Sequence, residues 1–189
     1  MSHRIEKPFL IFVEGKDDVA VIELLVSHLN IADSVQVISA DGKDKLRKFI
    51  RTFVALEGFP ERVQGVAIIR DADTDPGAAR TSAEDSLNGI ENARVYLLPD
   101  DSGPGILEDL CLQTLQDRPD LQCVDTFMEC MGATGITLSN PPKFRMRALL
   151  TALDDGKTRD TFWAAEKRLL NPTHPAFHPL LNFLKSFTS

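Results

Sequence analysis

The chain has 189 residues, of which 43% are hydrophobic and 26% charged, so it can form one globular domain with a sizeable core and at most a small appended part. Its net charge of −7 argues against a broad surface that coats nucleic acid, although it does not exclude an enzyme that holds phosphate groups through a metal. The three cysteines are odd in number and lack Cys-x-x-Cys spacing, which argues against a zinc site and predicts reduced thiols in a cytoplasmic protein. No segment resembles a signal peptide or approaches membrane-spanning length, so we expect no membrane partner.

Short apolar runs alternate with helical patterns through the first half of the chain. Continuous apolar runs bounded by turn residues predict buried strands, and these cover residues 9–13, 35–38, 66–69 and 93–98. Apolar residues at helical spacing predict helices that follow residues 17–18 and 41–43, with a weaker helix at 77–88. This alternation predicts a three-layer α/β fold, with a mostly parallel four-stranded sheet and helices on both faces.

Two of the predicted strands end in acidic residues. The strand at 9–13 continues into Glu14, and the strand at 66–69 continues into Asp71 and Asp73. In the strand order 2-1-3-4 these two strands are neighbours, and sites in open α/β sheets form beyond the carboxyl ends of strands at such a point. We therefore expect the three carboxylates to meet in a crevice.

The Asp71-Ala72-Asp73 stretch indicates a metal site. In an extended chain, side chains two residues apart point to the same side. Like charges so close are costly unless a cation lies between them, and oxygen ligands suit Mg²⁺ or Mn²⁺. The alternative is a solvated acidic loop that follows a strand.

The pattern changes to helices after residue 100. A loop covers residues 100–105, and further helices are predicted at 106–112 and roughly at 119–131, 142–153, 160–170 and 177–187. No linker-like stretch divides the two halves. We therefore expect an α/β domain at 1–110 and a helical extension at 111–189 that packs on it.

The two acidic motifs together resemble the Toprim domain of topoisomerases, bacterial primases, overcoming-lysogenization-defect (OLD) nucleases and small stand-alone bacterial proteins. The first motif, Glu-Gly-x-x-Asp, matches residues 14–18, and the second, Asp-x-Asp, matches residues 71–73. The resemblance covers about residues 8–110, and residues 105–110 are most similar to the small stand-alone proteins. The chain has no topoisomerase tyrosine domain and no zinc-binding primase module.

The resemblance implies a Mg²⁺- or Mn²⁺-dependent site for phosphodiester chemistry. Asp71 and Asp73 would hold the metal, and Glu14 would bind metal or act as a general acid or base. The nuclease branch has further acids and a later lysine, and the corresponding residues here are Asp18, Glu108 with Asp109 beside it, and Lys143.

Three further basic residues are candidates for phosphate contacts, namely Lys16, Lys43 and Arg145. Two metals held by such carboxylates would stabilise the attacking and leaving oxygens of an in-line displacement, and Lys143 or Arg145 would offset developing negative charge. Each residue also has a simpler interpretation: a surface turn for Glu14, helix-dipole partners for Glu108 and Asp109, and a solvated helix start for Lys143.

Other motifs argue for structure rather than chemistry. No Gly-x-x-x-x-Gly-Lys loop exists, which excludes a P-loop. His174 and His178 have the spacing of a helical metal pair, but prolines interrupt them. Tyr96 is predicted to be buried in a strand, and the aromatic residues of the tail have the helical spacing of a core.

Two functions follow from these patterns. The first is a metal-dependent enzyme that cleaves phosphodiester bonds of nucleic acid, DNA or RNA, or a related phosphoryl-transfer protein. The second is a non-catalytic Toprim-fold module that binds metal, nucleotide or a protein partner, as part of a defence or toxin assembly. The full set of acids favours the first function, the acidic net charge favours the second, and a homo-oligomer stays open under both.

Overall fold

A computed structural model describes residues 4–167 and 169–189. The strands are β1 (Phe9–Val13), β2 (Val35–Ser39), β3 (Gly65–Asp71) and β4 (Ala93–Leu98). The helices are α1 (Lys16–His28), η1 (Lys43–Lys45), α2 (Leu46–Val54), α3 (Phe59–Arg62), α4 (Pro76–Leu87), α5 (Leu107–Gln113), α6 (Pro119–Ala133), α7 (Pro141–Leu153), α8 (Thr161–Glu166), η2 (Pro175–Phe177) and α9 (His178–Phe187).

The four strands form one sheet in the order β2-β1-β3-β4, and every pair in it is parallel. The register places Val13 opposite Ile69, so β1 and β3 end close together at the same edge. The predicted α/β class and strand order are therefore confirmed, and the arrangement is consistent with a Toprim-like fold.

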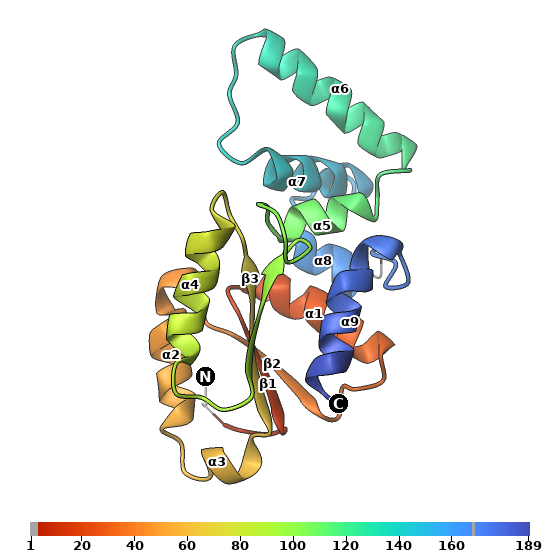
Figure 1. Cartoon of the computed structure of the whole chain (residues 1–189). Helices are drawn as coiled ribbons and strands as arrows, with labels where there is room; N and C mark the ends of the chain where they lie inside the picture. The colour runs from red at the N-terminus through yellow and green to blue at the C-terminus, as the bar shows by residue number, and fades with distance from the viewer. Residues whose placement is uncertain (1–3, 168) are drawn as a thin grey trace.

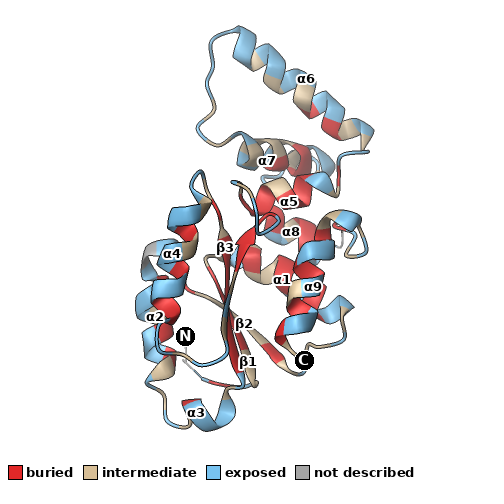
Figure 2. Cartoon of the chain, in the orientation of Figure 1, coloured by how far each residue is buried: buried red, intermediate tan, exposed pale blue. Residues whose placement is uncertain are grey.

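Helices cover both faces of the sheet (Figure 1). Along β3, Ala67 and Ile69 pack in the core shared with α1 and α9, whereas Val66 and Ile68 pack in the core shared with α2 and α4. This follows from the strand period of two, because successive side chains point to opposite faces. Figure 2 shows buried residues on the inner sides of these helices.

The C-terminal helices extend the α1 face of the sheet and cover its carboxyl edge. Leu110 of α5, Leu149 of α7 and Leu184 of α9 belong to the same core cluster as Ile11 and Ile69. Figure 1 shows α5, α7 and α6 in succession beyond the ends of the strands. The expectation that this part packs on the sheet agrees with the shared core, while the division at residue 110 stays a prediction.

Three local features differ from the sequence expectations. The short helix α3 was not predicted, the helix expected at 160–170 ends at Glu166, and the last helix begins with a 3₁₀ turn. Residue 168 of the predicted helix lies outside the described residues. Tyr96 is buried, as predicted. Within the described ranges, no helix has the length and apolar content needed to cross a membrane.

Candidate metal and phosphate site

Glu14 lies at the end of β1, on the same side of the sheet as Arg70. Its Oε1 atom is 3.1 Å from Nε of Arg70, but the Arg70 Nε–H donates to the Asp71 carbonyl at 3.3 Å. As a result, Oε1 of Glu14 is the one buried side-chain oxygen or nitrogen without a hydrogen-bond partner in the described part of the chain. Burial raises the pKa of Glu14 to about 7, against the lowering effect of Arg70.

Asp18 lies in the first turn of α1, where its carboxylate closes the start of the helix. Its Oδ2 accepts a hydrogen bond of 2.8 Å from the Gly15 N–H, an N-terminal capping interaction. The residue is only 8% exposed. Burial, followed by repulsion from Asp71, raises the pKa of Asp18 to about 7.

Asp71 is the last residue of β3, and it holds the start of α5. Its Oδ1 accepts a hydrogen bond of 2.8 Å from the Leu107 N–H. Burial raises the pKa of Asp71 to about 6, although this hydrogen bond and the Lys143 ammonium oppose the rise. Asp71 therefore joins the sheet to the element that carries Glu108.

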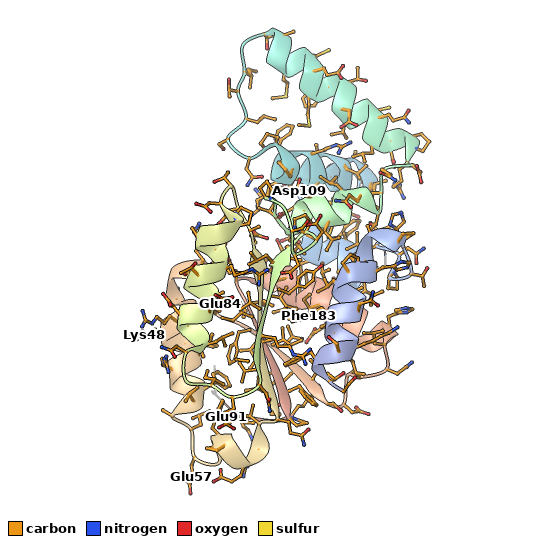
Figure 3. The ribbon with its side chains drawn as sticks, viewed as in Figure 1. Lys48, Glu57, Glu84, Glu91, Asp109 and Phe183 are labelled. Atoms are coloured by element: carbon orange, nitrogen blue, oxygen red, sulfur yellow. The ribbon has the colours of Figure 1, made fainter. Side chains whose placement is uncertain are left out.

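Glu108, in the first turn of α5, is 6% exposed, and its side chain forms no ion pair with a described residue. Burial raises its pKa, and the charge of Lys143 opposes the rise. Asp109, the next residue, has a different role: it accepts a hydrogen bond of 2.9 Å from the Ile106 N–H and caps α5. Figure 3 labels Asp109 where α5 begins beneath α7.

A cavity of about 290 Å³ brings these side chains together. We call it the acidic pocket; its charged lining residues are Glu14, Lys16, Asp17, Asp18, Asp41, Asp71, Glu108 and Lys143. The Lys143 side chain forms no ion pair with a described residue, yet its charge opposes the rise that burial causes in the pKa of Asp17, Asp71 and Glu108. Asp17 was not predicted as a site residue; the available signal was its position beside Asp18.

Asp73 does not line the acidic pocket, contrary to the expectation that it points to the same side as Asp71. That expectation assumed extended backbone, but Asp73 has a φ of 53° and bridges to Gly105. Its carboxylate lies 3.2 Å from Nζ of Lys43 and 3.9 Å from Nη2 of Arg70. Asp73 instead lines a neighbouring cleft of about 820 Å³ beside α4.

As arranged, no group of three or more His, Cys, Asp or Glu side chains in the described ranges is poised to hold a metal ion. The predicted metal cluster of Glu14, Asp71 and Asp73 therefore stays a prediction. In this arrangement the Arg70 guanidinium lies between Glu14 and Asp73 and contacts both. Arg70 was missed in the sequence, although a basic residue that ends a buried strand was the available signal.

The other predicted phosphate contacts are dispersed. Lys16 lines the acidic pocket but pairs with Asp160 at 3.1 Å, and Lys43 pairs with Asp73. Arg145 is turned away from the pocket and forms two hydrogen bonds of 2.5 and 2.6 Å to Asp125, which join α7 to α6. Its predicted phosphate role stays a prediction, and in this arrangement its guanidinium is engaged by Asp125.

Gly105 sets the path of the loop that leads to α5. It exchanges two backbone hydrogen bonds with Asp73, at 2.8 and 2.9 Å, and has a φ of +146°. A Cβ atom there would lie 2.7 Å from Cδ of Pro99. A side chain would thus be both strained and crowded.

We therefore expect Gly105→Ala to lower the free energy of unfolding by about 1–3 kcal/mol. Gly103→Ala is the matched control, because its added Cβ would meet nothing within 4 Å; we expect a change below about 0.5 kcal/mol. Urea denaturation followed by circular dichroism measures both. Equal destabilisation by the two variants would contradict the steric argument.

Residues 8–189 match the family model described as "Protein of unknown function (DUF3226)", so the chain belongs to this family. Comparison with the curated proteins and with the solved structures finds no match.

Proposed function

We propose that this member of the DUF3226 family is a Toprim-type protein that cleaves phosphodiester bonds of nucleic acid with the help of Mg²⁺ or Mn²⁺. The observation that supports it is the acidic pocket, in which carboxylates from β3, α1 and α5 and the loop after β1 face Lys143 of α7. We place the protein in the cytoplasm, where its three free cysteines would stay reduced.

The residues of the acidic pocket fit a hard divalent cation. The donors are oxygens only, as Mg²⁺ and Mn²⁺ prefer. Oε1 of Glu14 is buried without a hydrogen-bond partner, and the buried Glu108 forms no ion pair with a described residue. Mg²⁺ commonly keeps several waters and uses only one or two carboxylates, so a closed cage of three ligands is not required. Glu108 and one of its neighbours Asp18 and Asp71 would hold the ion, and Glu14 would serve either as a further ligand or as an acid–base group.

A bound divalent cation would polarise a phosphate oxygen and lower the pKa of a water. The chain's own groups would complete the chemistry. Glu14, with a pKa raised to about 7, can accept and release a proton near neutral pH. Lys143, which has no competing ion pair with a described residue, would hold a phosphate oxygen and stabilise developing charge.

One observation favours a second function, a binding module without cleavage. Arg70 already pairs with Glu14 and Asp73, two of the three carboxylates that the Toprim resemblance assigns to catalysis. A site neutralised in this way would still bind a metal-bound nucleotide at the remaining carboxylates.

A cleavage assay separates the two functions. Wild-type protein is incubated with plasmid, single-stranded DNA and RNA, each with Mg²⁺, Mn²⁺ or EDTA. We expect cleavage of at least one substrate with a divalent cation and none in EDTA. Cleavage that persists in Asp71→Asn would indicate a contaminating nuclease, and absence of cleavage despite metal binding would favour the binding module.

A further inference from the structure

Arg70 occupies an unusual position for a basic residue. It lies in β3 directly before Asp71, and its side chain is 7% exposed. The guanidinium reaches Glu14 through Nε at 3.1 Å and Asp73 through Nη2 at 3.9 Å. An arginine keeps its charge even when buried, so the space between these two carboxylates contains a permanent cation.

The charges on the two sides of β3 are balanced differently. Asp73 has two cationic neighbours, Lys43 and Arg70. By contrast, Asp18, Asp71 and Glu108 form no ion pair with a described residue, although all three line the acidic pocket. The charges of Asp71 and Glu108 are therefore opposed by that of Lys143 without a direct ion pair. The Arg70 guanidinium would repel a second cation placed beside it.

We infer that the acidic pocket takes a single divalent cation through Glu108 and one of its neighbours Asp18 and Asp71, and that the Arg70 guanidinium occupies the place of a second cation between Glu14 and Asp73. The inference rests on the proposed metal-dependent function and specifies the number of ions in its site. Glu14 is then held by Arg70 rather than by the metal, which assigns it to proton transfer. Asp73 becomes a residue that positions Arg70 and Lys43.

Metal binding is measured directly by Mn²⁺ titration, with calorimetry and with electron paramagnetic resonance of the free ion. Wild-type protein should bind one Mn²⁺ per chain. Glu108→Gln should weaken this binding at least about tenfold, whereas Asp73→Asn should change it less than about threefold. Two ions in the wild type, or equal losses in the two variants, would overturn the inference.

The Arg70→Gln variant tests whether the Arg70 guanidinium takes the place of a second cation. Removal of the guanidinium should allow a second, weaker Mn²⁺ ion to bind, while the control Arg47→Gln, at an exposed position on α2 that lines an adjoining cavity, should still bind one. Continued binding of one ion by Arg70→Gln would overturn the role given to Arg70. If Arg70→Gln does not fold, as judged by circular dichroism, the inference is tested by the comparison of Mn²⁺ binding to Glu108→Gln and Asp73→Asn.

The outcomes keep this inference separate from the proposed function. A wild-type protein that binds one Mn²⁺ but cleaves no substrate would support the inference and reject the nuclease. A protein that cleaves a substrate and binds two ions would reject the inference and support the nuclease.

Discussion

Glu108→Gln is expected to slow metal-dependent cleavage at least about 100-fold, since the loss of one metal-binding carboxylate removes a few kcal/mol of transition-state stabilisation. Glutamine has the same shape, so the packing of the buried side chain should be kept. The effect should appear in single-turnover rates at saturating Mn²⁺, where slow product release does not hide it.

The adjacent residue provides the matched control for this prediction. Asp109→Asn preserves an oxygen that can cap α5, and Asp109 lies outside the acidic pocket. We expect its rate to stay within about threefold of wild type. If the two variants lose activity equally, the loss reflects the stability of α5 and not a specific role of Glu108.

The free energy of unfolding in EDTA is expected to fall as the pH rises from about 5 to about 7.5. The pKa values of Glu14 and Asp18 are raised to about 7, and that of Asp71 to about 6. In this window the folded state binds more protons than the unfolded state, so stability decreases with pH. Each carboxyl with a pKa near 7 contributes up to about 3 kcal/mol, although repulsion within the pocket prevents simple addition.

Thermal unfolding at a series of pH values measures this effect. Mg²⁺ or Mn²⁺ should raise the melting temperature most at the upper end of the window, because the ion binds the ionised folded state. Asp18→Asn should flatten the pH dependence and stabilise the metal-free protein near pH 7.5. A melting temperature that rises with pH in EDTA would contradict the raised pKa values of the pocket carboxyls as the cause.

The sheet could be predicted because its signals are local. The strands at 9–13 and 93–98 are found as predicted, since uninterrupted apolar runs between turn residues have few other stable arrangements. The C-terminal boundaries were harder to predict. The helix α8 ends at Glu166, and Pro175 begins a 3₁₀ turn before α9, because the packing of these short segments decides where they stop.

The site was predicted in part. Glu14, Asp18, Asp71, Glu108 and Lys143 do line one pocket, because parallel strands end at a shared edge and α5 and α7 cover it. Asp73 and Arg145 do not line that pocket, for reasons that a sequence pattern does not contain. A left-handed backbone turned Asp73 toward Lys43, and an ion pair with α6 holds Arg145.

The two ends of the described chain meet in one core. The rings of Phe9 in β1 and Phe187 in α9 pack edge to face, with centroids 5.4 Å apart, and Phe183 lies on the same helix, against Tyr96 (Figure 3). β1 is synthesised before α9, so the part of this face that α9 covers stays open until α9 has been made, although α1 can already pack on the rest of the face. We expect the uncovered apolar side chains to be accessible to chaperones during that interval.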